Sequence, residues 1–332
     1  MQESELRQDP MTKEWVVIAP VRANRSHPNG PQAAELTTHD KSCPFCLGNE
    51  ALTPPDVYRD VDPEGSWLVR VVPNKFAALS PTASAKRKEG FFRSAPGTGY
   101  HEVIIETPNH GDDISRMSPE QVLRILRAYR ERQRRLSDDP RVRFVVIFRN
   151  HGERAGTSLP HPHSQLVATP VVPALIRRKH ETAERYFDDT GNCIYTDVRD
   201  AEISDGARII EDTTAFTVFT PFASRSAFEM LIVPRSIRAS FALATDEELV
   251  SLSRILRRSL RRLRQCCGDV DYNYVVHSCP SKDEDEEYYL WHIQILPRIS
   301  QPAGFEIGSG MYINTVAPEV AAQQLRLASV GE

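Results

Sequence analysis

Two histidines one residue apart, His161 and His163, follow a loop rich in glycine and small hydroxyl residues. Side chains two positions apart on an extended chain point to the same face, so His161, His163 and Gln165 are predicted to line one side of a strand. Pro162 stiffens this segment and removes a backbone donor. A neutral imidazole is a good nucleophile toward phosphorus, and a histidine adduct divides one displacement into two easier steps. The pattern therefore favours covalent phosphate chemistry over a surface turn.

The same segment carries groups that suit the charge of a reacting phosphate. Gln165 can donate a hydrogen bond to a non-bridging phosphate oxygen without changing the net charge of the site. Ser158 and Thr157, with backbone N–H groups near Gly156, could surround the charge that develops during the reaction. We therefore expect the loop before the two histidines to belong to the same site as their rings.

Cys43 and Cys46 form a Cys-x-x-Cys pair, which is the second chemical signal. Two thiolates at this spacing can hold one zinc ion in tetrahedral geometry, with two further ligands from elsewhere in the chain. His110 and His161 are the candidates for those ligands. A redox pair is the alternative, since a single pair of this kind serves either use. A redox site would be expected at the start of a helix, which the adjacent proline and glycine disfavour.

Composition limits the class of protein. The chain has 332 residues, enough for one large core or two ordinary domains, and its net charge of -4 gives no general attraction to nucleic acid. No stretch approaches the roughly 20 apolar residues of a membrane helix, and the polar start has no signal core. Six cysteines are too few for a disulfide framework at this length. We therefore expect a cytoplasmic protein with no membrane or nucleic-acid partner.

The elements that must position these residues are short strands and two long amphipathic helices. Val122 and Ile125 belong to the apolar stripe of the first helix, and Ser118 with Gln121 predicts a capping box at its start. The predicted helices cover 118–136 and 245–266, and a connecting helix covers 175–187 before a turn at 188–192. The predicted strands cover 14–19, 66–72, 102–106, 142–148, 165–168, 216–219, 228–233, 272–277 and 289–296.

The order of these elements repeats along the chain. Pro108 and Pro234 lie 126 residues apart, and His161 and His292 lie 131 apart. Such a steady offset indicates two copies of one strand–strand–helix–strand–strand unit. We predict an α+β fold of two tandem halves, 1–170 and 171–332, that share a mainly antiparallel sheet flanked by helices.

The motifs together resemble the galactose-1-phosphate uridylyltransferase family, the transferase branch of the histidine triad superfamily. The resemblance spans nearly the whole chain, and the histidine triad halves are the copies predicted above. Superfamily hydrolases usually carry a third histidine where Gln165 stands. The matching segments are 9–10, 15–20 with Arg22 and Arg25, 43–46, 72–79, 106–110 and 150–165.

The resemblance implies a role for each matching residue. His163 matches the nucleophile that accepts the nucleotidyl group, and Gln165 matches the residue that binds the transferred phosphate. The structural zinc would be held by Cys43, Cys46, His110 and His161, and no organic cofactor is expected. Residues matched to substrate contacts, with Ser158 counted among the catalytic groups, are Arg22, Arg25, Asn74, Phe76, Asn150, Gly156, Thr157, Ser158, Gln294 and Phe305.

The chain departs from the usual family pattern in three places. Ser164 follows the second histidine where the family often has glycine. Some members hold a second metal in the C-terminal half, which His277 and His292 match in part, but Gln294 stands where another histidine would be. The match to a second metal site is therefore incomplete, which favours structural or substrate-facing roles for His277 and His292. The stretch 304–314 is glycine-rich where the family contacts the hexose, and it resembles a plant-type subgroup, the ADP-glucose phosphorylases, which share the sequence His-Pro-His-Ser-Gln.

The resemblance implies a ping-pong nucleotidyltransferase that works through a nucleotidyl-His163 intermediate. The first expectation is uridylyl transfer between UDP-glucose and galactose 1-phosphate, in a homodimer. The alternatives are adenylyl transfer, as in ADP-glucose phosphorolysis, a nucleotide hydrolase and a non-catalytic nucleotide-binding protein. The partners are then a nucleotide sugar and a hexose 1-phosphate or inorganic phosphate.

Overall fold

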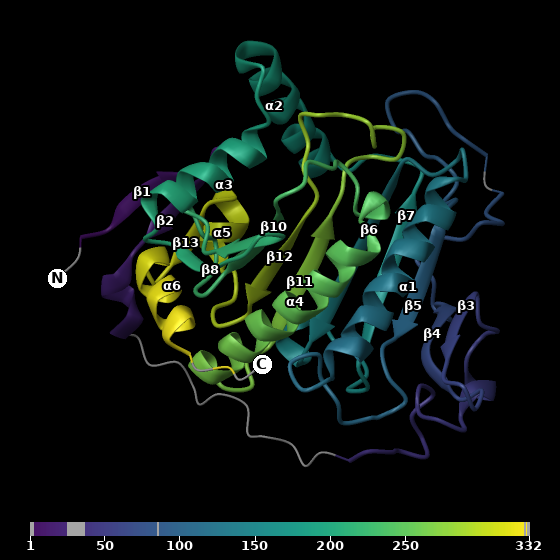
Figure 1. Ribbon diagram of the computed structural model, residues 1–332. Helices are drawn as coiled ribbons and strands as arrows, with labels where there is room; N and C mark the ends of the chain where they lie inside the picture. The colour runs from purple at the N-terminus through teal and green to yellow at the C-terminus, as the bar shows by residue number, and fades with distance from the viewer. Residues whose placement is uncertain (1–2, 25–36, 85, 329, 331–332) are drawn as a thin grey trace.

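The computed structural model describes residues 3–24, 37–84, 86–328 and 330, so Arg25 lies outside the described residues. A ten-stranded sheet runs through the centre of the molecule (Figure 1) in the order β3-β4-β5-β7-β6-β11-β12-β10-β9-β8, and all neighbouring strands are antiparallel. Its strands are β3 Tyr58–Val61, β4 Trp67–Pro73, β5 Tyr100–Ile105, β6 Phe144–His151, β7 His163–Thr169, β8 Ile209–Asp212, β9 Phe216–Phe219, β10 Met230–Pro234, β11 Tyr272–His277 and β12 His292–Pro297.

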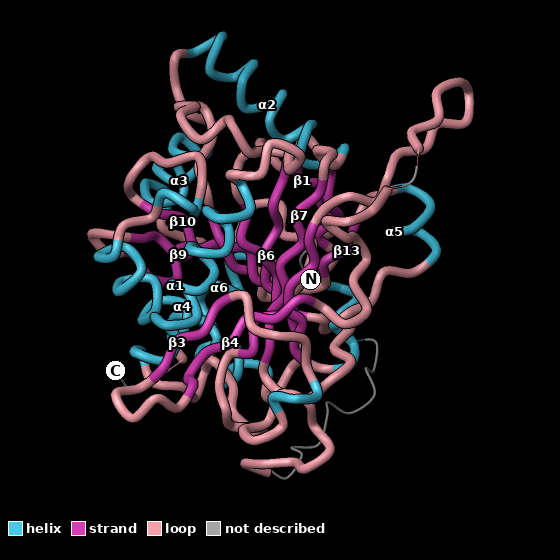
Figure 2. The backbone as a smooth tube through the Cα atoms, turned by 90° about the vertical axis from the view of Figure 1, so that its right-hand side faces the viewer, coloured by secondary structure: helices cyan, strands magenta, loops and turns pink. Residues whose placement is uncertain are grey.

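Two long helices, α1 (Pro119–Ser137) and α4 (Asp246–Cys267), pack against each other and cover one face of the sheet (Figure 2). Their apolar stripes meet alternate residues of the central strands, such as Leu166 of β7 and Ile293 of β12, in one large core. Side chains alternate across a strand. His163 lies an odd number of positions from Leu166, and His292 an odd number from Ile293, so both histidines point to the face away from α1 and α4.

The opposite face of the sheet is covered differently in its two halves. Helices α2 (Ala174–Thr190) and α3 (Ile194–Asp205) pack on the C-terminal half through a second core that includes Tyr195, Leu231 and Tyr289. On the N-terminal half, a smaller core joins Phe45 to Val103 of β5. That half is covered by loops, which leave room for a site beside β7.

The remaining elements lie beside the C-terminal half. A three-stranded sheet packs its Val16 and Ile18 against Ala223 and Ala317. Its strands are β1 (Glu5–Gln8), β2 (Trp15–Ile18) and β13 (Tyr312–Asn314), accompanied by helices α5 (Gly304–Ser309) and α6 (Pro318–Leu327). Short 3-10 helices cover Pro20–Asn24, Glu50–Leu52, Glu153–Ala155 and Phe241–Leu243.

The strand order supports the predicted fold class. The sheet reads as two five-stranded sets that meet at the antiparallel pair β6–β11, where Val276 pairs with Ile147. Each set contains the strands on either side of one long helix, and the α+β fold with a large antiparallel sheet flanked by helices is confirmed. The division into domains at residue 170 stays a prediction, because the sheet is continuous across it.

Several predicted boundaries are wrong for identifiable reasons. The connecting helix continues to Thr190 and ends at Gly191, whose φ of +73° suits a glycine, so the predicted turn starts later. Ser118 caps α1 by accepting from the Gln121 backbone, but the Gln121 side chain binds the Leu68 and Glu106 carbonyls instead of completing a capping box. Tyr289 precedes β12 and is buried in the second core. Among the described residues, no helix is long and apolar enough to cross a membrane.

Candidate active site

His163 opens β7 with its ring in a fixed orientation. Its Nδ1 lies 2.8 Å from the carbonyl oxygen of His161, and because a carbonyl only accepts, Nδ1 carries the ring proton. The lone pair is then on Nε2. The side chain is almost fully buried. Its ring and that of Phe45 meet edge to face, with their centroids 5.4 Å apart. Burial lowers the pKa of His163, which favours the neutral, nucleophilic imidazole at neutral pH.

His163 lies between two cavities that also share Ser158 and Leu159. The first, the apolar cavity, has a volume of about 720 Å³ and is lined on one side by apolar residues of the 42–54 loop and on the other by Asn74 and Phe76. The second, the polar cavity, has a volume of about 500 Å³ and is lined by the 149–154 segment and by two carboxylates, Asp269 and Asp271. A ligand that crosses His163 could therefore place an apolar ring system in one cavity and polar groups in the other.

Gln165 lines the apolar cavity on the same face of β7 as His163. Its Oε1 lies 2.8 Å from Nε2 of His101, a residue of β5 that belongs to no motif singled out from the sequence. The loop after β4 joins the same group, because the Phe76 N–H donates to Asn74 Oδ1 over 2.8 Å and the Ala78 N–H donates to His101 Nδ1 over 3.2 Å. The predicted residues Asn74, Phe76 and Gln165 are thus brought together with His163.

The loop 152–158 is held by residues of the C-terminal half. The Arg154 N–H donates to Asp271 Oδ2 over 2.6 Å. Gly152, at φ +85°, passes so close that a Cβ there would stand 2.1 Å from the Asp271 carboxylate. Asn273 of β11 donates to Asn150 Oδ1 over 2.8 Å and to the Ala155 carbonyl over 2.9 Å. The side chains of Asp271 and Asn273 therefore fix the loop from across the β6–β11 seam.

Two predicted members of this loop have partners within it. The Thr157 hydroxyl donates to the Asn150 carbonyl. Gly156 takes a left-handed conformation at φ +88°, which glycine adopts without strain. Thr157 and Gly156 therefore shape the loop, while Ser158 reaches both cavities.

A buried polar network lies directly behind His163. Ser164 points to the helix side of β7, where its hydroxyl donates to Glu106 and contacts the hydroxyl of Tyr129. Glu106 is paired with Arg149 at 3.0 Å, and the Tyr129 hydroxyl lies 2.6 Å from that of Tyr274. Each charge in this network has a partner, as burial requires. Ser164 therefore ties the strand that carries His163 to β6, α1 and β11, a role that glycine could not fill.

Cys43, Cys46, His110 and His161 form a cluster whose ligand atoms all lie within 4.8 Å of one another. Cys46 Sγ lies 3.3 Å from His110 Nδ1 and 3.6 Å from His161 Nδ1. His161 Nε2 lies 2.8 Å from the Thr107 carbonyl, so that nitrogen donates and Nδ1 keeps its lone pair for a metal. Two thiols and two imidazoles, all buried and this close together, are a ligand set that fits a tetrahedral metal ion such as zinc.

The cluster corrects one prediction made from spacing. His161 precedes β7 and its Nδ1 lies in this cluster, so His161 does not line one side of the strand with His163 and Gln165 as predicted. The chain bends at residues 158–161, just before β7 begins at His163.

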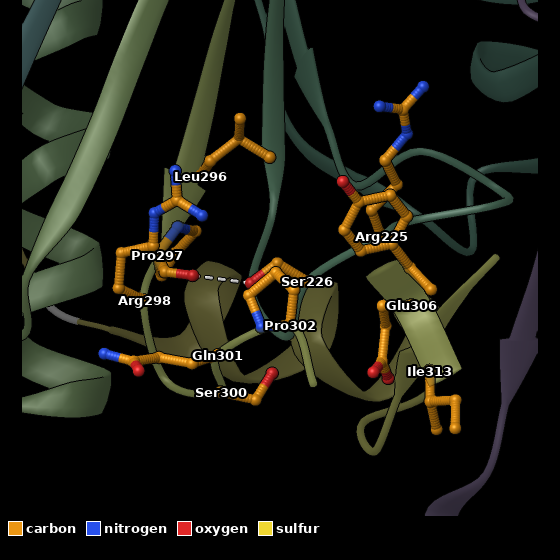
Figure 3. Close-up of a pocket in the computed structure, with 11 residues that line it drawn as sticks. Arg225, Ser226, Leu296, Pro297, Arg298, Ser300, Gln301, Pro302, Glu306 and Ile313 are labelled. Carbon is orange, nitrogen blue, oxygen red and sulfur yellow. Dashed lines mark hydrogen bonds between the residues drawn. The ribbon is translucent and has the colours of Figure 1, made fainter. Parts of the chain in front are cut away.

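Three predicted substrate residues lie apart from His163 in this chain. Arg22 is exposed in the 3-10 helix after β2, beside the three-stranded sheet. Gln294 binds His277 and Glu229 over 2.9 and 2.6 Å under α2 and α3. Phe305 is half-exposed on α5, whose Glu306 points toward a separate small cavity near Arg298 and Arg225 (Figure 3). Their predicted substrate contacts stay predictions.

Comparisons with known proteins cover almost the whole chain. Residues 1–173 match the family model of the galactose-1-phosphate uridyl transferase N-terminal domain, and residues 114–328 match a domain family of unknown function. ADP-glucose phosphorylase of Arabidopsis thaliana is 34% identical, over 99% of this chain and 94% of the relative. A crystal structure of that enzyme with bound ADP-glucose has a TM-score of 0.86, covering 99% of this chain and 100% of the other. Galactose-1-phosphate uridylyltransferase of Thermotoga maritima is 27% identical, over 97% and 98%.

Proposed function

Because this chain belongs to the galactose-1-phosphate uridyl transferase family and is therefore a nucleotidyltransferase, we propose that His163 carries the nucleotidyl group. In the first step, Nε2 of His163 attacks the α-phosphorus of a nucleotide sugar, a P–N bond forms, and the bond to the hexose 1-phosphate oxygen breaks. In the second step, an oxygen of an acceptor phosphate attacks the same phosphorus and releases Nε2. The first product leaves before the acceptor enters, so the kinetics are ping-pong.

The orientation of His163 is the observation that carries this proposal. Its Nδ1 is bound to the His161 carbonyl, its pKa is lowered by burial, and the ring lies at the junction of two cavities. A neutral ring with one free nitrogen, facing space large enough for a nucleotide, is what an attack on phosphorus requires.

We assign the remaining groups by their chemistry. The apolar cavity, with Phe45 and Phe76 on its walls and Asn74 as a polar group, suits the base and ribose. Gln165 and Ser158, with backbone N–H groups of the loop, would donate to the non-bridging oxygens of the transferred phosphate. The polar cavity, where Asp269 and Asp271 can accept from hydroxyl groups, suits the hexose side of the donor or the acceptor.

We propose ADP-glucose and inorganic phosphate as the substrates, with glucose 1-phosphate and ADP as products. Two points support this proposal. The Arabidopsis thaliana ADP-glucose phosphorylase is more similar to this chain than the Thermotoga maritima uridylyltransferase is. The sequence His-Pro-His-Ser-Gln, which includes Ser164, also resembles the ADP-glucose phosphorylases. Uridylyl transfer between UDP-glucose and a hexose 1-phosphate is the second candidate. It is favoured by the family model, which matches over the half that contains His163.

We propose zinc as the metal of the Cys43, Cys46, His110 and His161 cluster. Zinc prefers tetrahedral thiolate and imidazole ligands, and a closed four-ligand site is structural. When bound, it would join the 43–46 loop and the segment after β5 to the residue two positions before His163. Assembly as a homodimer and residence in the cytoplasm stay predictions from the resemblance and the composition.

Intact-protein mass spectrometry after brief incubation with ADP-glucose or UDP-glucose tests the proposal. Wild-type protein should gain the mass of AMP from ADP-glucose and lose it when phosphate is added, while His163→Ala should gain nothing. A UMP-sized adduct in place of AMP would move the assignment to the second candidate. Binding without any adduct, or an adduct that persists in His163→Ala, would rule out covalent transfer through His163.

A further inference from the structure

Gln165 carries a side-chain amide whose two ends have nearly the same shape and opposite hydrogen-bonding character. Only the NH2 end can donate to a phosphate oxygen; the carbonyl end would repel it. Gln165 lies opposite Val103 in the register of β7 and β5, two strands that run side by side (Figure 1). Which end of the amide faces the apolar cavity is therefore decided by the neighbours of Gln165.

His101 stands two residues before Val103 on β5, on the same face and diagonal to Gln165, within reach of a long side chain. The Ala78 N–H donates to His101 Nδ1, so the proton of the neutral ring is on Nε2. That nitrogen lies 2.8 Å from Gln165 Oε1 and donates to it. The amide of Asn74, fixed by the Phe76 N–H, has its Nδ2 3.1 Å from the same ring nitrogen, and two N–H groups cannot satisfy each other there. The Gln165 oxygen is the acceptor present.

The C-terminal half contains the reverse arrangement at the equivalent place. Gln294 lies opposite Leu231 on β10, and Glu229 stands two residues before Leu231, as His101 does before Val103. A carboxylate can only accept, and the Gln294 Nε2 donates to Glu229 over 2.6 Å. The Gln294 oxygen in turn lies 2.9 Å from His277 Nε2. The two amides are therefore held in opposite senses: the diagonal neighbour His101 holds the oxygen of Gln165, and the diagonal neighbour Glu229 holds the nitrogen of Gln294.

We propose that His101 is a positioning residue, one that turns the NH2 end of Gln165 toward the transferred phosphate. This inference rests on the proposed function, since it acts on the same phosphate. His101 also links Gln165 to the loop 74–78, so that the residues around the base and those around the phosphate are held as one unit.

The test is the single-turnover rate of nucleotidyl adduct formation on His163 with ADP-glucose, measured with the nucleotide affinity. His101→Ala should slow the adduct by about tenfold, since it removes one neutral hydrogen bond and frees the amide to rotate. His101→Gln, which keeps an N–H donor, should restore much of the rate. His101→Glu, which copies the C-terminal half and reverses the amide, should slow the adduct by roughly a hundredfold. Affinity should change less than rate in each case.

A double-mutant cycle separates positioning from general damage. In a Gln165→Ala background, His101→Ala and His101→Glu should add less than about twofold, because the group through which they act is gone. Glu229→Gln is the matched control in the C-terminal half and should leave the adduct rate unchanged. Thermal unfolding of each variant checks that the fold is retained.

Two outcomes would overturn the inference. One is a His101→Ala rate equal to wild type; the other is an equal loss from the His101 variants whether or not Gln165 is present. Absence of the adduct in wild-type protein would instead count against the proposed function and leave the two failures distinguishable.

Discussion

The two halves of the sheet carry the same His-x-Gln pattern, His163 with Gln165 and His292 with Gln294, in two different settings. Each pair opens the corresponding strand, and each histidine has its Nδ1 bound to the carbonyl two residues earlier, over 2.8 Å for His163 and 3.0 Å for His292. Burial lowers the pKa of both, to about 3 for His292. Protonation and ring orientation therefore do not distinguish them.

The covering of the sheet does distinguish them. In the C-terminal half, α3 places the centroid of the Tyr195 ring 5.3 Å from that of His292, and the ring of His277 stacks on His292 with centroids 4.7 Å apart. The ammonium of Lys179 from α2 is buried nearby and helps to lower the pKa of both histidines, while burial lowers the pKa of Lys179 to about 8. A histidine of the right type and orientation therefore does not by itself make an active site. In the C-terminal half, the side chains of α2 and α3 fill the space beside His292, whereas His163 lies beside two cavities.

The largest effect should come from removing one histidine of each pair. His163→Ala should reduce turnover by about a thousandfold or more, because the nucleophile of the proposed mechanism is absent. His292→Ala should leave turnover within a few-fold of wild type and lower the melting temperature instead. Turnover and thermal unfolding of both variants check this, and equal losses of activity would remove the distinction between the halves.

In the part of the chain that the structure describes, the cluster of Cys43, Cys46, His110 and His161 lies in the N-terminal half, so loss of a metal there should destabilise the fold more than a matched cysteine change in the C-terminal half. Cys46→Ser or chelation should destabilise the fold by about 3 kcal/mol or more, since binding energy of a structural metal is folding energy. The matched change Cys279→Ala, at a buried cysteine of the second core, should cost only about 1 kcal/mol and retain the metal. Metal content by mass spectrometry and chemical denaturation give both values. Metal-free protein that is as stable as zinc-loaded protein would contradict a structural role for the metal.

The contact between the halves can be broken at one glycine. Gly152→Ala would place a Cβ 2.1 Å from the Asp271 carboxylate, so either that carboxylate or the loop that contains Ser158 must move. Either shift disturbs the hydrogen bond from the Arg154 N–H to Asp271 that holds the loop, and we expect activity to fall about thirtyfold. Gly206→Ala, at φ +72° with no neighbour within 4 Å, is the control for backbone strain alone. It should lower stability by about 1 kcal/mol and leave activity intact. Steady-state rates for both variants decide whether the seam positions the loop.

The smallest effect concerns pH. The pKa of His163 is lowered below the ordinary 6.5 by burial, so the neutral form that attacks phosphorus persists as pH falls through 6.5. Adduct formation should therefore be nearly constant from pH 8 to 6.5 and decline only at lower pH. The pH profile of the single-turnover rate measures this. A decline centred above 6.5 would show that another group controls the step.

The same depressed pKa values have a consequence for stability. His163 and His292 bind protons less readily in the folded protein than in the unfolded chain. Their contribution to stability is therefore fully present above about pH 6.5 and is lost as pH falls below that value. His292→Ala should weaken this dependence, which denaturation at pH 7 and pH 5 would detect.

Much of the fold followed from sequence pattern. The amphipathic periods of α1 and α4 and the alternating or continuous apolar runs of the central strands predicted the layers, because each element must bury one face. The missed elements are β1, β3, β8, β13, α3, α5 and α6, since segments that are short or have mixed side chains show no clear period. The site was recovered where its residues are close in sequence, as in the block 150–165.

The sequence by itself determined the residue types of the site, the repeat of the fold unit and the family, since these depend on local spacing and composition. Only the tertiary structure decided that His161 turns toward Cys46 while His163 faces two cavities. It also decided that His101 and Asn273, distant along the chain, hold Gln165 and the loop. The physical reason is that a side chain's orientation and access depend on the partners that antiparallel pairing brings beside it, and those partners are set by the register of the sheet.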